Sequence, residues 1–118
     1  MPVDFNLTKT FPHSFADTYR SAYNSAKAIK GKILKHDPEK RIMNIQFDKK
    51  LYGKYLGDRS RFEIQFSEGD GPETTLTILA YPVNPIGQRL MFGQREGVIP
   101  AVSSAFYEEM QKRLSADE

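Results

Sequence analysis

The side chains that could do acid–base or metal chemistry are few in this sequence. The two histidines, His13 and His36, stand apart in the chain, and neither belongs to a spaced ligand motif. A metal site or a catalytic base would need partner side chains supplied by the fold. We expect His13 to act locally before a helix and His36 to be solvated at a turn, and we predict neither a metal nor a cofactor.

The hydroxyls, carboxylates and glycines form no catalytic motif either. Ser103 and Ser104 lie in the first turn of an expected helix, not at a strand-to-helix elbow. Glu108 and Glu109 are expected on the exposed side of that helix. The glycines that lack the spacing of a phosphate-binding loop are Gly87, Gly93 and Gly97. We predict no catalytic residue and no enzyme.

One basic and aromatic stretch is a candidate nucleic-acid surface. Its basic residues are Lys49, Lys50, Lys54, Arg59 and Arg61. With Tyr52 and Tyr55 they could contact phosphates and stack on bases. The alternative is a solvated edge strand, because lysines on an edge discourage pairing with another chain.

Charge is unevenly distributed along the chain. Residues 1–61 carry 13 Lys and Arg against 6 Asp and Glu, whereas residues 62–118 carry 4 against 9. Such asymmetry can mark a face for nucleic acid or an anionic surface. Alternatively, the two halves interleave in one sheet and their charges neutralise each other.

Length and composition predict one domain over residues 1–118, with a frayed tail at Ser115–Glu118. A chain of 118 residues has room for one core. The absence of cysteine excludes disulfides and thiolate ligands. The N-terminus lacks the basic and apolar regions of a secretion signal, and no apolar run is long enough to span a membrane. We therefore expect a cytoplasmic location.

Two amphipathic helices are predicted, one near each end. After Pro12 and a capping Ser14, apolar residues at helical spacing predict a helix closed by Gly31 in the left-handed conformation. Its stripe is Phe15, Tyr19, Ala22, Tyr23, Ala26 and Ile29. The second helix starts at Pro100, a residue suited to a first turn. Its stripe is Val102, Ala105, Phe106, Met110 and Leu114.

The remaining segments predict strands with one buried face. The alternating segments are Val3–Phe11, Arg41–Asp48, Arg61–Ser67 and Thr74–Tyr81. Lys32–His36 should pair with Arg41–Asp48 across a turn at Asp37-Pro38. Leu51–Leu56 should bulge or bend at Gly53, and a last strand is expected near Arg89–Phe92. The fold class is therefore α+β, with a single antiparallel sheet of five to six strands and both helices on one face.

This order of elements resembles the helix-grip domains, the START and Bet v 1-like group. The segments that carry the resemblance are the helix Phe15–Lys30, "DPEKRIMNIQF", "FEIQF", "TLTILAYP", "GQRLMFG" and the final helix. The chain is a strand or two shorter than that family usually is. The resemblance implies a curved sheet that grips the last helix and leaves an apolar cavity between them.

Three functions remain open. The first is a non-enzymatic binding domain for a small apolar ligand, with a pocket lined by Leu76, Ile78, Leu90, Phe92, Phe106 and Met110. The second is a protein-interaction or self-associating module, as monomer or homodimer, with an exposed patch of Ile42, Leu51, Tyr55, Leu79 and Tyr81. The third is weak nucleic-acid binding through Lys49–Arg61.

Overall fold

A five-stranded antiparallel sheet is the largest element of the protein. The computed structural model describes residues 5–56, 59–84, 86, 88 and 97–116. In spatial order the strands are β1 (Phe5–Phe11), β7 (Thr74–Val83), β6 (Arg59–Glu68), β3 (Ile42–Phe47) and β2 (Lys32–Asp37). Every neighbouring pair is antiparallel, so the predicted fold class is confirmed.

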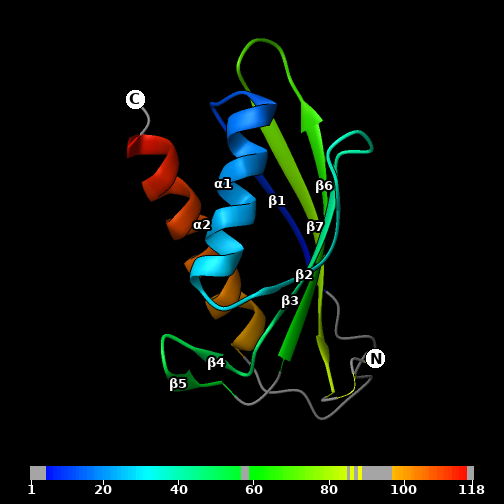
Figure 1. Ribbon diagram of the computed structural model, residues 1–118, viewed down its shortest axis with the longest axis vertical. Helices are drawn as coiled ribbons and strands as arrows, with labels where there is room; N and C mark the ends of the chain where they lie inside the picture. The colour runs from blue at the N-terminus through cyan, green and yellow to red at the C-terminus, as the bar shows by residue number, and fades with distance from the viewer. Residues whose placement is uncertain (1–4, 57–58, 85, 87, 89–96, 117–118) are drawn as a thin grey trace.

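Both helices cover the same face of this sheet (Figure 1). Helix α1 (Phe15–Ala28) contacts β2 and β6, whereas α2 (Val98–Ala116) contacts β6 and β7. The two helices also pack against each other along their length. Within the described residues, neither helix is apolar over a stretch that could cross a bilayer.

Alternation along the strands explains why one sheet face is covered. On β6, Phe62, Ile64 and Phe66 point to the helices and are buried, while Glu63 and Gln65 between them point away. Strands β3 and β7 repeat this period of two. The inner side chains of these two strands that are buried are Met43, Ile45, Phe47, Leu76, Ile78 and Ala80. The core therefore lies between the sheet and the helices.

The segment predicted to bend at Gly53 is a separate small hairpin, and not a strand of the main sheet. Strands β4 (Lys50–Leu51) and β5 (Lys54–Tyr55) pair with each other. Tyr52 and Gly53 form the turn, with φ of 52° and 81°. Two consecutive positive φ values are typical of the two-residue turns that connect the strands of a hairpin. Glycine adopts a positive φ without strain, so Gly53 suits the second position of this turn.

Helix α1 starts as predicted but ends differently. The Ser14 side chain accepts from the Asp17 N–H at 3.3 Å, which caps the first turn. At the other end the left-handed residue is Lys30, with φ of 66°, and the prediction for Gly31 is wrong. Gly31 is needed for space, since a Cβ there would lie 2.8 Å from Cε1 of Phe47.

Helix α2 begins two residues before the predicted Pro100, which lies in its first turn, where no backbone donor is required. All five residues of its predicted stripe are buried. The predicted strand at Arg89–Phe92 lies outside the described residues.

Candidate binding site

The two sides of α1 differ in an unexpected way. The residues that it buries are mostly small and polar, namely Thr18, Ser21, Ala22, Ser25 and Ala26. Ser21 is 3% exposed, and its hydroxyl donates to the Met110 carbonyl of α2 at 3.1 Å. Small side chains allow the two helix backbones to approach closely. Of the predicted stripe, Ala22, Ala26 and Ile29 are buried as expected, whereas its three aromatic residues are only partly buried.

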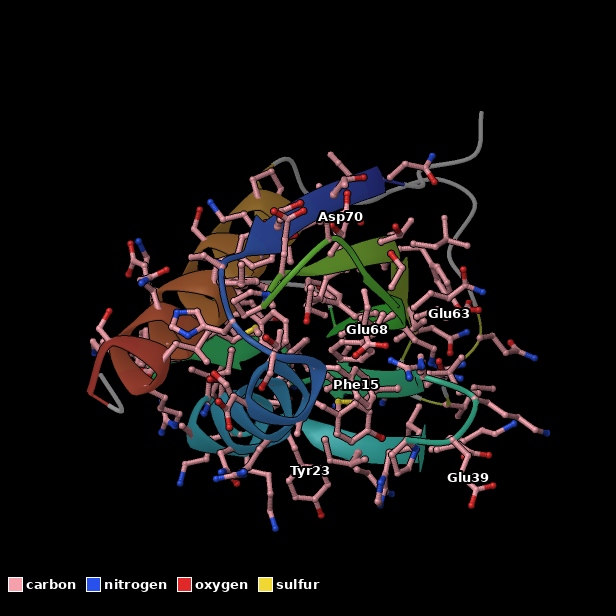
Figure 2. All side chains as sticks on the ribbon, turned by 90° about the horizontal axis from the view of Figure 1, so that it is seen from above. Phe15, Tyr23, Glu39, Glu63, Glu68 and Asp70 are labelled. Atoms are coloured by element: carbon pink, nitrogen blue, oxygen red, sulfur yellow. The ribbon has the colours of Figure 1, made fainter. Side chains whose placement is uncertain are left out.

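The aromatic residues of α1 lie instead on its side nearest β2. Phe15, Tyr19 and Tyr23 are all half-buried. Phe15 and Tyr19 are 5.4 Å apart between ring centroids, and each contacts Phe66 of the sheet, at 5.9 and 5.0 Å. Phe15 points from α1 toward the sheet, whereas Tyr23 extends outward beside β2 (Figure 2). These rings form a continuous aromatic surface from the core to the solvent.

His36 of β2 completes this surface. Its ring lies 5.2 Å from the Tyr23 ring, edge to face at 67°, and 6.5 Å from that of Tyr19. The Asp37 carboxylate next to it accepts from the backbone N–H groups of Glu39 and Lys40 and so shapes the following turn. His36 is exposed, as the sequence predicted, and it also forms one wall of an aromatic groove.

The groove between α1 and the β2 turn has a volume of about 490 Å³. Its described lining consists of Phe15, Ala16, Tyr19, Arg20, Tyr23, His36 and Pro38. Small-molecule sites usually measure about 300–1,000 Å³ and combine apolar walls with few polar groups. This space, which we call the aromatic groove, has both properties.

Cations surround the aromatic groove. The Arg41 guanidinium lies 4.3 Å from the centre of the Phe15 ring, and Lys27 Nζ lies 5.2 Å from that of Tyr23. Arg20 is part of the lining, and its Nη2 lies 3.5 Å from Oδ1 of Asp17. Both of these side chains are well exposed. Among the described residues, the lining of the groove thus includes a guanidinium and no carboxylate. Part of this positive charge is neutralised, because Glu68 lies 2.9 Å from the Arg41 guanidinium and Asp17 lies near Arg20.

Acid–base chemistry has little support at this site. Burial raises the pKa of the Tyr19 phenol, and the Asp37 carboxylate adds to the rise. The protonated hydroxyl donates to the Ile42 carbonyl at 3.4 Å. Among the described residues, no cluster of three or more His, Asp or Glu side chains could hold a metal ion.

The six residues predicted to line an internal pocket fall into two groups. Leu76, Ile78, Phe106 and Met110 are in the core with no exposed surface. Phe106 packs there against Phe47 and Phe62, with centroid distances of 6.0 and 6.1 Å. The other two, Leu90 and Phe92, lie outside the described residues. The pocket between the sheet and the last helix stays a prediction.

The five residues of the predicted basic surface are divided between two elements. Lys49, Lys50 and Lys54 belong to the β4–β5 hairpin, whereas Arg59 and Arg61 belong to β6. Arg61 points to the open face of the sheet, where it donates to Gln46 Oε1 at 2.7 Å. The structure thus places the three lysines together and Arg61 elsewhere.

The predicted apolar patch is also dispersed. Ile42, Leu79 and Tyr81 lie on the open face of the sheet, and Leu51 and Tyr55 on the hairpin. Tyr81 is 7% exposed, and its hydroxyl donates to Glu63 Oε2 at 2.6 Å. These side chains therefore do not form one exposed surface.

The placement of Glu109 differs from the sequence prediction. The prediction put it on the exposed side of the last helix, but the residue is 9% exposed. It accepts from Tyr52 at 2.9 Å and from Arg113 at 2.7 Å. Together these two donors lower the pKa of its carboxyl. Glu109 thereby fastens the tip of the β4–β5 hairpin to α2.

The aromatic groove itself was missed because its residues were assigned to the core. A second pattern on α1 held the missing signal. Its small residues at 18, 21, 22, 25 and 26 recur at helical spacing just as the aromatic residues do. When two stripes on one helix could both be buried, only one of them faces the core and the other stays at the surface.

Comparison with known proteins defines the fold. No protein-family model matches the chain, and no curated protein matches it. The crystal structure of Ara h 8.0201 is similar, with a TM-score of 0.64, 10% identity, and coverage of 95% of this chain and 97% of the other. Protein MLL2253 from Mesorhizobium loti has a TM-score of 0.63 and 12% identity, with 98% of each chain covered. Both likenesses fit a helix-grip-like arrangement of sheet and helices.

Proposed function

We propose that the protein is a non-enzymatic binding domain whose aromatic groove takes a small aromatic molecule with an anionic group. The groove supports this proposal more than the fold does, because one fold hosts many functions. The observation that carries it is the lining: three rings of α1 and His36 line an open groove of about 490 Å³, with Arg20 as the charged member.

The aromatic walls define the body of the ligand. Phenyl and phenol rings pack best against other rings in edge-to-face or offset geometry, which adds about 0.5–1.5 kcal/mol per pair beyond area burial. Tyr23 and His36 already adopt an edge-to-face arrangement that leaves the Tyr23 ring half-buried. A planar ring system can cover the remaining surface of these walls.

The charges define the ligand's polar group. A carboxylate or sulfonate can receive the Arg20 guanidinium in a bidentate manner, since the contact of Arg20 with Asp17 is long and exposed. A cationic ligand would instead face Arg20, Lys27 and Arg41 with no carboxylate on the lining. We therefore expect naphthalene-2-carboxylate to bind more tightly than naphthalene-2-amine or cyclohexanecarboxylate.

The proposal is tested by following backbone amide chemical shifts during titration with naphthalene-2-carboxylate. We expect shifts to concentrate at Ala16, Tyr19, Tyr23 and His36. Ala16 is exposed on the groove lining, so Ala16→Trp should fill the groove and weaken binding at least tenfold. Asn24→Trp is the matched control, because Asn24 is exposed on the same helix and outside the lining.

Two results would overturn the groove as the site. One is equal weakening by the two tryptophan variants. The other is a set of shifts centred on Phe47 and Phe106, which would place the ligand between the sheet and α2, as the sequence predicted.

A further inference from the structure

One end of the molecule collects basic side chains. The end of α1, the β4–β5 hairpin and the start of β6 meet at the same end of the long axis, which measures 42 Å (Figure 1). The basic residues of these segments are Lys30, Lys32, Lys49, Lys50, Lys54 and Arg59. We call this region the basic end.

The opposite end carries most of the acidic turn residues. The β6–β7 turn, which lies at that end (Figure 1), contributes Asp70 and Glu73, and the neighbouring strand ends with Glu68. There the cation Arg41 is paired, with its guanidinium 2.9 Å from Glu68. The two halves of the sequence do interleave in the sheet. Even so, within the described residues the two ends differ, because the basic end is rich in lysines, whereas the opposite end holds both signs, with Lys40 and Arg41 among its carboxylates.

The lysines of the basic end lack acidic partners in the described part of the chain. The nearby carboxylates have other partners: Glu109 accepts from Tyr52 and pairs with Lys112 and Arg113, and Asp48 Oδ1 accepts from the Lys49 backbone N–H at 2.7 Å and lies 4.0 Å from Arg59. Lys30, Lys50 and Lys54 form no ion pair there. Their positive charge is therefore available to an anionic partner.

Two tyrosines stand among these lysines. Tyr52 is 65% exposed and Tyr55 is 56% exposed, although both are large apolar side chains. Lys49 Nζ lies 5.8 Å from the centre of the Tyr55 ring. Tyr52 is held in place by its hydrogen bond to Glu109, which leaves its ring accessible. The hairpin thus presents aromatic surfaces in a fixed orientation next to cations.

A groove of about 390 Å³ separates the hairpin from the end of α1. Its described lining is Ala28, Ile29, Lys30, Asp48, Lys50, Tyr52 and Gly53. Lys30, Lys50 and the Tyr52 ring fit a phosphate and a base of the same nucleotide, while the Asp48 carboxylate on the same lining reduces its positive charge. Lys49 and Lys54 lie outside this lining, so the cations continue beyond the space for one nucleotide.

We propose that the basic end binds single-stranded nucleic acid. Unstacked bases would cover the rings of Tyr52 and Tyr55, and the phosphates would contact Lys30, Lys50 and Lys54. Aromatic side chains can stack on any accessible base, which makes such binding tolerant of sequence but selective for single strands. This site is independent of the aromatic groove, which is formed by the other end of α1.

The test is fluorescence anisotropy with a fluorescein-labelled 20-nucleotide oligothymidylate and the full chain at low salt. The double variant Lys50→Gln/Lys54→Gln should bind at least tenfold more weakly. It should also reduce the slope of log K against log salt by about 1.4, at about 0.7 per phosphate contact on a single strand. Tyr55→Ala should weaken binding about 5- to 100-fold, as expected for one lost stacking platform.

Lys40→Gln is the matched control, because Lys40 is an exposed lysine in the turn at the opposite end. It should leave binding unchanged, and circular dichroism melting should show all variants folded. Three results would overturn the proposal: no binding at low salt, a 20-base-pair duplex bound as tightly as the single strand, or equal weakening by Lys40→Gln. Capture by phosphatidylserine vesicles without oligonucleotide binding would assign the basic end to a membrane surface and would equally overturn it.

Discussion

The two helices carry similar apolar stripes but use them differently. In α2 the stripe from Val102 to Leu114 is buried completely against the sheet. In α1 the aromatic residues stay half-buried at the rim, and the small residues between them contact α2. An amphipathic pattern therefore shows that a helix has an apolar side, but what covers that side depends on its neighbours.

The largest expected difference between the helices is in stability. Phe106 is fully buried, and its replacement in Phe106→Ala should cost about 3–5 kcal/mol of unfolding free energy. Tyr23→Ala, at the rim of α1, should cost about 1 kcal/mol and abolish ligand binding in the aromatic groove. Urea denaturation measures both, and Phe106→Leu replaces the alanine variant if that variant does not fold. Equal costs would mean that the Tyr23 ring is part of the core.

The close approach of the helices can be tested at Ser21. Leucine would place a large side chain where a 3% exposed serine contacts α2, so Ser21→Leu should destabilise by about 1–3 kcal/mol through overpacking. Asn24→Leu, one turn along on the exposed side, should change stability by less than about 0.5 kcal/mol. If Ser21→Leu stabilised the protein, the helices would be further apart than described.

Ser25 offers an effect of the opposite sign. Its hydroxyl is buried and has no hydrogen-bond partner among the described residues. An unpaired buried hydroxyl destabilises the folded protein, because it loses its hydrogen bonds to water. Ser25→Ala should therefore raise the unfolding free energy by about 1 kcal/mol. Ser21→Ala loses its bond to Met110 and should lower the free energy by about 1 kcal/mol. Thermal and urea denaturation measure both changes. If the two variants both raised or both lowered the unfolding free energy, the two serines would not differ in this way.

The smallest expected effect on the unfolding free energy is that of Glu109, the buried carboxylate of α2. Since the pKa of Glu109 is lowered in the folded protein, its stabilisation is present above the unfolded pKa of about 4.3 and is lost as the pH falls through the folded value. At pH 6, Glu109→Gln should cost about 1 kcal/mol. The difference between variant and wild type should shrink toward pH 3 in urea titrations. A difference independent of pH would mean that the ionised carboxylate is not what holds the hairpin.

Several local features were predictable because they depend on residues close in sequence. Alternation predicted β6 and β7, and Asp37-Pro38 predicted the turn between β2 and β3. The cap at Ser14 follows from a hydroxyl three residues before a backbone donor. The left-handed residue at the end of α1 was misplaced because Gly31 is required for contact with Phe47, which is distant in sequence.

The candidate sites were predictable only in part. The basic residues of the hairpin were identified from their spacing, but their separation from Arg61 required the strand direction of β6. The burial of Glu109 could not be read from the chain, and the aromatic groove only in part, since each joins residues of different elements.

The sequence by itself determined the helices, the strands and the sides on which each is apolar, because periodicity is a property of neighbouring residues. The tertiary structure decided which of two stripes on α1 faces α2, which carboxylate of α2 is buried and where the lysines gather. Those outcomes depend on how the elements pack against each other. On α1, for example, small side chains form the contact with α2, so its large aromatic side chains stay at the surface.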